Sequence, residues 1–333
     1  MKIATPRWWY RREGSGLLSG LLRPLSAIYA DQTAKRLAGA QGFDPGVPVI
    51  SVGNVTMGGS GKTPVTREIL HMLARQGLDG HALSRGYGGS FAGPVLVDPD
   101  AHTAAEVGDE PLMLALDHPA WIARDRAEGA KAAAAAGAEA IVLDDGHQNP
   151  ALNKSLSLIV VDGETRDGEW PFGDGSVFPA GPMREPLATG LARADAVVVL
   201  LPADLETADP ALLALFGDLP VFIAWLEPVR APSAGPKLGF AGIAKPWRVE
   251  ASLKAAGADL KGFRRFPDHG LYSERELKGL AAEADRLGAG LITTEKDWAR
   301  LPAAWRSRIE AWPMRARFEK EGPFLKLLPR GRD

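Results

Sequence analysis

A glycine-rich segment that runs into Lys-Thr offers the clearest chemistry in this chain. An apolar run ends at Gly53, a loop follows, and Pro64 opens a stretch with helical spacing. Glycines let successive backbone N–H groups turn towards phosphate oxygens, and the following helix N-terminus adds a favourable dipole. In this interpretation Lys62 reaches the β- and γ-phosphates of a nucleotide, and the Thr63 hydroxyl binds Mg²⁺. The residues predicted to bind the nucleotide are Thr56, Met57, Gly58, Gly59, Ser60, Gly61, Lys62 and Thr63.

The loop departs at one position from the usual phosphate-binding pattern. That pattern has a glycine five residues before its final glycine, where this chain has Thr56. Gly58, Gly59 and Gly61 keep the backbone adaptable, and the order of strand, loop and helix is retained. The alternative is a glycine-rich connection with an accidental Gly-Lys-Thr. The setting of the loop favours phosphate binding.

Paired carboxylates follow a second apolar run. Ala138–Leu143 has the character of a buried strand and leads directly into Asp144 and Asp145. Ligands of open α/β sheets bind at the carboxyl ends of the strands. One carboxylate there can hold Mg²⁺ directly or through water. Asp-Asp-Gly is by itself also typical of a turn, but beside the phosphate loop it predicts a metal site of Thr63, Asp144 and Asp145.

Short apolar runs alternate with helical stretches between residues 47 and 229. The expected strands are Val47–Val52, His81–Ser84, Ala138–Leu143, Leu156–Val161, Ala194–Leu201 and Val221–Leu226. The expected helices Val65–Gln76 and Arg124–Ala136 are each followed by a glycine. Continuous apolar runs are typical of parallel strands that are buried on both faces. The sequence therefore predicts an α/β fold with a doubly wound, mostly parallel sheet of the P-loop NTPase type.

Three prolines mark a change in organisation near residue 230, at Pro228, Pro232 and Pro236. A second alternating region follows, with expected elements at Lys237–Ala241, Trp247–Ala256, Glu274–Leu287 and Gly290–Thr294. We therefore predict an N-terminal helical segment over residues 1–45, a P-loop core domain over 46–230 and a smaller C-terminal α/β domain over 231–333.

The N-terminal segment differs in character from the rest of the chain. Trp8, Trp9 and Tyr10 lie among the basic residues Arg7, Arg11 and Arg12. The apolar residues that follow are spaced to form one face of an amphipathic helix: Leu17, Leu18, Leu21, Leu22, Leu25, Ile28 and Tyr29. Pro24 would bend that helix or mark its restart. Such a face suits either a membrane interface or the protein's own core, and the residues alone leave both interpretations open.

The overall composition excludes several classes of protein. Hydrophobic residues make up 45% of the chain and charged residues 24%, which is typical of a folded protein with a sizeable core. A net charge of −2 argues against general nucleic-acid binding. The absence of cysteine excludes disulfides, thiolate metal sites and cysteine nucleophiles. No apolar stretch approaches the ~20 residues that span a bilayer, and we expect a cytoplasmic location.

Six motifs occur in a characteristic order: Gly53–Pro64, Ser84–Gly89, Gly108–Pro111, Asp144–Gln148, Pro179–Glu185 and Thr294–Asp297. One such motif is weak evidence, but six in register are highly specific. In these residues the chain resembles the tetraacyldisaccharide 4′-kinases of lipid A synthesis. Thr56 is also what this family has at its position, so the departure noted above supports the resemblance.

The resemblance implies an ATP-dependent lipid kinase. It would transfer the γ-phosphoryl group to the 4′-hydroxyl of a tetraacylated glucosamine disaccharide 1-phosphate, with ATP and Mg²⁺ as cofactors. It further implies peripheral contact with the cytoplasmic face of the bacterial inner membrane through Trp8–Tyr29, which favours the membrane interpretation of that segment. Apart from the lipid substrate, we expect neither a nucleic-acid partner nor an obligate protein partner.

The same resemblance assigns roles by position. Asp109 matches the family's proposed catalytic base, and His269 matches the histidine that supports it. A sugar hydroxyl must lose its proton during phosphoryl transfer, and an aspartate oriented by a histidine could accept it. Arg184 matches an arginine that neutralises charge near the phosphates, and Lys62 completes the expected catalytic set. His147 stands where the family often has Leu or Phe, and we expect it to be a packed or exposed histidine.

Two other functions compete with this interpretation. A GTP-dependent maturation factor would need Asn/Thr-Lys-x-Asp after a strand to recognise guanine. In Thr294–Asp297 the lysine directly precedes the aspartate, so the spacing differs, and cysteine- or histidine-rich clusters are missing. A peripheral membrane scaffold could bind nucleotide only as a switch. Such a scaffold would catalyse no phosphotransfer, so removal of Asp109 would cause no loss of that activity.

Overall fold

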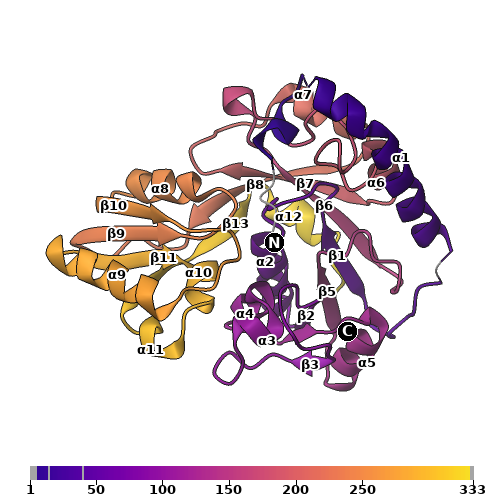
Figure 1. Ribbon diagram of the computed structural model, residues 1–333. Helices are drawn as coiled ribbons and strands as arrows, with labels where there is room; N and C mark the ends of the chain where they lie inside the picture. The colour runs from indigo at the N-terminus through magenta and orange to yellow at the C-terminus, as the bar shows by residue number, and fades with distance from the viewer. Residues whose placement is uncertain (1–5, 14–15, 40, 331–333) are drawn as a thin grey trace.

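A mostly parallel sheet forms the centre of the molecule in the computed structural model, which describes residues 6–13, 16–39 and 41–330. Within them the sheet has nine strands in the order β13-β8-β7-β6-β1-β5-β2-β4-β3 (Figure 1). Only the edge strands β3 and β13 run antiparallel to their neighbours. The strands are β1 (Val49–Gly53), β2 (Gly80–Ser84), β3 (Val95–Leu96), β4 (Ala120–Ile122), β5 (Ala140–Asp144), β6 (Leu156–Asp162), β7 (Ala196–Pro202), β8 (Val221–Pro228) and β13 (Met314–Phe318).

Helices cover both faces of this sheet. One face packs on α2 (Lys62–Arg75), α3 (Ala104–Val107), α4 (Asp109–Leu114) and α12 (Glu321–Leu325). The other face packs on α5 (Arg126–Ala135), α6 (Leu187–Leu191) and α7 (Pro210–Leu213). In β5, Val142 faces the first group of helices, whereas Ile141 and Leu143 face the second. Both faces are therefore buried, as the continuous apolar runs require.

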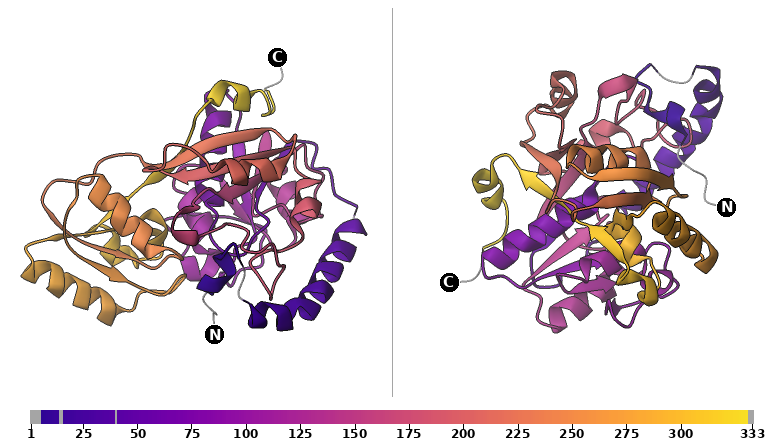
Figure 2. Two further views of the ribbon diagram at one scale, coloured as in Figure 1. Left: turned by 90° about the horizontal axis from the view of Figure 1, so that it is seen from above. Right: turned by 90° about the vertical axis from the view of Figure 1, so that its left-hand side faces the viewer.

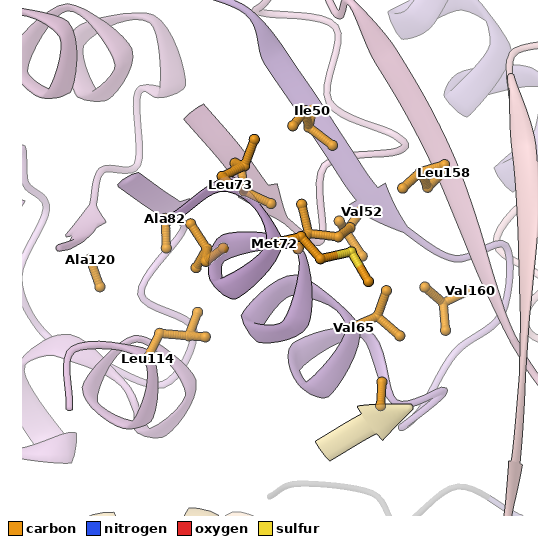
Figure 3. Packing of buried hydrophobic residues seen from close by; sticks show 14 of the residues in the cluster. Ile50, Val52, Val65, Met72, Leu73, Ala82, Leu114, Ala120, Leu158 and Val160 are labelled. Carbon is orange, nitrogen blue, oxygen red and sulfur yellow. The ribbon is translucent and has the colours of Figure 1, made fainter. Parts of the chain in front are cut away.

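The hydrophobic core around α2 fixes the helix that carries the phosphate loop at its N-terminus. Val65, Ile69 and Met72 of α2 are fully buried. Figure 3 shows Val65 and Met72 near Val52 of β1 and Val160 of β6. Each such side chain contributes about 1.5–3 kcal/mol when it is removed from water. The packing holds the start of α2 at the end of β1.

The predicted fold class is confirmed by this architecture. Each of the six strands expected between residues 47 and 226 is present, with ends that differ by at most two residues. Sequence analysis missed β3, β4 and β13, which have 2, 3 and 5 residues. β3 and β4 are too short to show a clear periodicity, whereas β13 is as long as β1 but has Arg315 and Arg317 in place of a continuous apolar run.

A second, smaller sheet lies to one side of the first (Figures 1 and 2). Its parallel strands have the order β10-β9-β11-β12. They are β9 (Pro236–Ala241), β10 (Asp259–Arg265), β11 (Gly290–Thr294) and β12 (Ile309–Trp312), and the helices are α8 (Pro246–Ala255), α9 (Glu274–Arg286), α10 (Glu295–Ala299) and α11 (Ala303–Arg306). We refer to the units built on the two sheets as the large and small domains.

The chain returns to the large domain after β12. β13 pairs antiparallel with β8, and Phe318 and Phe324 are buried in the core of the large sheet. The structure therefore differs from the expectation that residues 231–333 form one C-terminal unit, because residues 314–328 pack with the large domain. Their apolar side chains cover the end of the large sheet beside α2.

The N-terminal helix α1 (Leu17–Ala38) presents apolar side chains to solvent. Leu18, Leu21, Leu25 and Ile28 are between 50% and 76% exposed. The helix is continuous over 22 residues and passes through Pro24, so of the two outcomes expected for this proline, a bend or a restart, the restart does not occur. In the described residues, no helix is both long and apolar enough to cross a membrane.

Small polar residues hold α1 against the large domain. Ser19 and Ser26 are buried, and their hydroxyls donate to the carbonyls of Ala180 (3.1 Å) and Val177 (2.7 Å). Figures 1 and 2 show α1 along the outside of the molecule. The sequence had left open that the apolar side chains of α1 pack in the protein's own core. The exposed leucines of α1 are not part of that core.

The aromatic residues before α1 do not all share this exposure. They belong to the short helix η1 (Arg7–Tyr10), in which Trp9 is buried and its ring contacts Phe178 edge-on at 5.8 Å between centroids. The sequence had suggested that Trp9 belongs to the outer surface of the N-terminal segment. Instead, Trp9 helps to anchor this segment to the large domain. The side chains of Arg7 and Leu17, which the sequence grouped with that surface, lie outside the described residues.

Candidate active site

The phosphate loop lies between the carboxyl end of β1 and the first residue of α2. Gly61 precedes α2 with φ +78°, a left-handed conformation that favours glycine. Inside the loop, the Asn54 side-chain amide donates to the Ser60 hydroxyl at 2.9 Å. The Met57 N–H donates to the Pro182 carbonyl at 2.6 Å, and its carbonyl accepts from the Tyr10 hydroxyl at 2.9 Å. Contacts from two distant segments therefore brace the loop.

Asp144 ends β5, the parallel neighbour of β1, and lies beside the loop. It pairs in register with Val52, and its carboxylate accepts from the hydroxyls of Thr63 (3.2 Å) and Thr66 (3.3 Å). The residue is only 2% exposed. Burial, together with the nearby charge of Glu110, raises the pKa of Asp144 to about 7, although Lys62 acts in the opposite direction.

Asp145 forms the centre of a cationic cluster. Its Oδ1 lies 3.6 Å from the Lys62 ammonium and 2.8 Å from the Arg184 guanidinium. Burial acts to raise the pKa of Asp145, but Lys62 and Arg184 outweigh it and lower the pKa to about 2. Arg184 also donates to the Thr56 carbonyl at 2.9 Å. The structure thus brings Lys62, Arg184 and the loop together, as sequence analysis expected.

Asp109 and His269 form a second group, which joins the two domains. Asp109 begins α4 after Gly108, and the Glu110 N–H donates to its Oδ1 at 3.0 Å. His269 Nδ1 lies 2.9 Å from Oδ2 of Asp109, a hydrogen bond in which the ring N–H donates. His269 has φ +54°, which is uncommon outside glycine and often marks a functional position. Asp109 and His269 are 160 residues apart in the sequence, and the structure brings them together as predicted.

The two groups lie at the same edge of the large sheet. Asp144 ends β5 and Asp145 follows it, and β2 is the next strand in the sheet. The backbone before Asp109 packs on the residues after β2, since a Cβ on Gly108 would lie 2.8 Å from the Tyr87 carbonyl. A phosphate-binding loop and a carboxylate–imidazole pair are therefore neighbours at the carboxyl edge, where open α/β sheets bind ligands.

The oxygen atoms around Asp144 fit a Mg²⁺ ion. Among the described residues, no Lys, Arg or His forms an ion pair with its carboxylate, and its hydrogen-bond partners are hydroxyls. The part of the chain that the structure describes contains no group of three or more His, Cys, Asp or Glu that could hold a metal. Mg²⁺ is usually bound through one or two carboxylates together with substrate phosphates. Thr63 and Asp144 would hold the ion, with Asp145 beside them.

Several neighbours of the site were not assigned a role from the sequence. Thr66 lies one helical turn beyond Lys62 and gives Asp144 its second hydroxyl partner. Gln148 accepts from Arg184 at 3.2 Å and donates to the Asn54 carbonyl at 2.7 Å, so it connects the cationic cluster to the loop. Its place in the Asp144–Gln148 motif was the available signal. His147 is buried and hydrogen-bonded within the fold, as a packed histidine would be.

Comparison with known proteins assigns the chain to a family. The family model described as tetraacyldisaccharide-1-P 4′-kinase matches residues 18–330. The chain belongs to this family. The proteins named tetraacyldisaccharide 4′-kinase from Caulobacter sp. (strain K31) and Phenylobacterium zucineum (strain HLK1) are 62% and 61% identical to it. These alignments cover 98% of the chain and 98% of the first relative, and 96% of the chain and 97% of the second.

A solved structure of the 4′-kinase family has the same fold. The crystal structure of LpxK from Aquifex aeolicus in complex with ATP superimposes with a TM-score of 0.73 at 25% sequence identity. The match covers 93% of this chain and 98% of that one. The resemblance inferred from the six motifs is therefore confirmed, and membership of a kinase family decides against the GTP-dependent maturation factor and the non-catalytic scaffold.

Proposed function

We propose that this 4′-kinase family member uses ATP to phosphorylate the 4′-hydroxyl of a tetraacyldisaccharide 1-phosphate in lipid A synthesis. The observation that carries the proposal is the placement of the Asp109–His269 pair beside a Lys62–Thr63 phosphate loop at one sheet edge. A kinase needs these two parts together, because phosphoryl transfer joins a bound nucleotide to an acceptor hydroxyl.

The nucleotide half of the site positions and neutralises the phosphates. In our proposal the backbone of residues 56–61 surrounds the phosphates of ATP, and Lys62 and Arg184 meet the charge that develops on the transferred group. Thr63 and Asp144 would hold Mg²⁺, which when bound would supply further neutralisation of the phosphate oxygens. Asp145 keeps Lys62 and Arg184 together on one side of the loop.

The acceptor half of the site handles one proton. The 4′-oxygen of the sugar forms a bond to the γ-phosphorus as the bond to the β-phosphate oxygen breaks, and ADP leaves. The hydroxyl proton passes to the Asp109–His269 pair, with Asp109 as the proposed base and His269 supporting it. Because these residues belong to different domains, the acceptor half exists only when the domains are docked.

We also propose that the protein contacts the cytoplasmic face of the bacterial inner membrane through α1. The lipid substrate carries four acyl chains, and each CH₂ removed from the bilayer costs about 0.8 kcal/mol, so the enzyme must work at the interface. The exposed side chains Leu18, Leu21, Leu25 and Ile28 supply an apolar surface. The exposed residues Arg11, Arg12 and Arg23 would meet anionic headgroups.

A direct assay tests the proposed reaction. The purified protein is incubated with ATP, Mg²⁺ and a tetraacyldisaccharide 1-phosphate in mixed micelles, and the product is examined by mass and by phosphorus NMR. We expect a single new phosphate on the 4′-oxygen. ATP hydrolysis without a phosphorylated lipid, or phosphate on another hydroxyl, would refute the proposal.

A further inference from the structure

The Thr294–Asp297 motif has no role in the reaction described above, yet it lies at the contact between the domains. Thr294 ends β11, and its hydroxyl accepts from the Asp297 N–H at 3.0 Å, which caps α10. α10 packs against α4, the helix that begins with Asp109. The motif therefore carries the part of the small domain that faces the proposed base.

Lys296 of this motif makes a close charged contact with α4. Its ammonium donates to Oε1 of Glu110 at 2.9 Å and lies 3.8 Å from Oδ2 of Asp109. Burial acts to lower the pKa of Lys296, but Glu110 and Asp109 outweigh it, so the pKa is above its usual range. The lysine is thus a cation that two neighbouring carboxylates of the large domain share.

The preceding residue ties the same short helix to α2. Glu295 accepts from Arg67 at 2.7 Å, and Arg67 also pairs with Asp117. Arg67 lies one and a half turns beyond Lys62 on the helix that follows the phosphate loop. Through Glu295 and Lys296, α10 is therefore attached to both the nucleotide half and the acceptor half of the proposed site.

Arg300 supports the histidine side of the pair from the same region. It is buried, and its guanidinium donates to the carbonyl of Gly270, the residue after His269, at 3.2 Å. Its Nε lies 3.8 Å from Oδ2 of Asp109. Burial acts to raise the pKa of Asp109, but the hydrogen bond from His269 and the charges of Lys296 and Arg300 hold it well below its usual range.

We propose that Lys296 is a positioning residue for phosphoryl transfer: its ammonium docks α10 on α4 and thereby keeps Asp109 within hydrogen-bonding distance of His269. The inference rests on the proposed function of that pair. The physical reason is that the pair has one member in each domain, so its geometry is only as well defined as the contact between the domains. A displacement of about 1 Å at such a site can lower the rate about 100-fold.

The experiment compares Lys296→Met, which removes the charge, with Lys296→Arg, which retains it. Lys278→Met is the matched control, because Lys278 is 71% exposed on α9 and pairs within its own helix with Glu274 at 3.5 Å. We expect Lys296→Met to lower kcat about 10- to 100-fold with the KM for ATP changed less than about twofold. Lys296→Arg should recover most of kcat, and Lys278→Met should match the parent.

A double variant asks whether Lys296 acts through Asp109. In an Asp109→Asn background, Lys296→Met should cost little further activity, since residues that act as a unit are not additive. An unchanged kcat in Lys296→Met would overturn the proposal. Independent, multiplicative losses in the double variant would also overturn it. A large rise in the KM for ATP in Lys296→Met would do the same, because the lysine would then contact the nucleotide.

Hydrogen exchange separates this inference from the proposed function. In Lys296→Met the amides of residues 268–272 should exchange faster than in the parent, while those of β1 and α2 stay protected. This readout does not depend on turnover, so it tests the docking even if the parent fails to phosphorylate the lipid. Equal exchange in parent and variant would overturn the docking role. Far-ultraviolet circular dichroism confirms that the variant is folded.

Discussion

Lys62 is the residue whose single replacement tests the phosphate loop most directly. It is the first residue of α2 and pairs with Asp145, so removal of its side chain leaves the hydrophobic core around α2 in place. We expect Lys62→Ala to lower kcat by about 10²–10³, the typical loss when one stabilising group for developing charge is removed. Steady-state kinetics on the purified variant check this, with thermal unfolding as the control for folding. Activity close to the parent would remove Lys62 from the site.

Asp144 gives a pH-dependent prediction at the same scale. Its pKa is raised in the folded protein to about 7, against about 3.9 in the unfolded chain. The ligand-free protein therefore loses stability as pH rises through this window, because folding must bury a charge. Asp144→Asn should raise Tm at pH 8 and raise it less at pH 5. ATP with Mg²⁺ should stabilise the parent more than the variant. A gain in Tm that is equal at both pH values would contradict a raised pKa of Asp144 in the folded protein.

Helix α1 carries the prediction at the scale of an element. Replacing Leu18, Leu21 and Leu25 together by Ser should weaken binding to anionic vesicles and raise the apparent KM for the lipid. The reason is that these side chains are exposed, so their loss removes the proposed membrane contacts without opening the core. Co-sedimentation with vesicles and nucleotide titration measure the two effects, and ATP affinity should not change.

Exposed leucines elsewhere on the large domain supply the control for α1. Leu96 and Leu116 are 48% and 39% exposed, and their joint replacement by Ser should leave vesicle binding unchanged. If the triple α1 variant unfolds or loses ATP binding, the helix has a structural role that its exposure does not suggest. If its vesicle binding matches the parent, the membrane-contact surface lies elsewhere.

At the scale of the whole molecule, the proposed base and its histidine connect the two domains. Asp109→Ala should lower kcat by about 10²–10⁴, the usual contribution of a general base, with little change in ATP binding. His269→Ala alone should do less damage. The double variant should be little worse than Asp109→Ala, since the pair acts through one proton. Single-turnover kinetics of the three variants measure this, and fully multiplicative losses would show two independent roles.

The sequence by itself determined the local parts of this protein. Continuous apolar runs predicted the parallel strands, because a strand that is buried on both faces needs apolar residues on both. The phosphate loop and the Asp144–Asp145 pair could also be recognised, because each belongs to one short segment whose chemistry depends on its own residues. Glycines after the helices marked two of their ends within a few residues.

Only the tertiary structure decided what depends on distant segments. The spacing of α1 predicted an apolar face but not its direction, which is set by the bonds of Ser19 and Ser26 to the loop near Ala180. The return of β13 to the large sheet depends on pairing with β8. Asp109 and His269 were paired through the family resemblance, since no local pattern relates residues so far apart. Their distance, and the position of Lys296 beside them, follow from how the two sheets pack together.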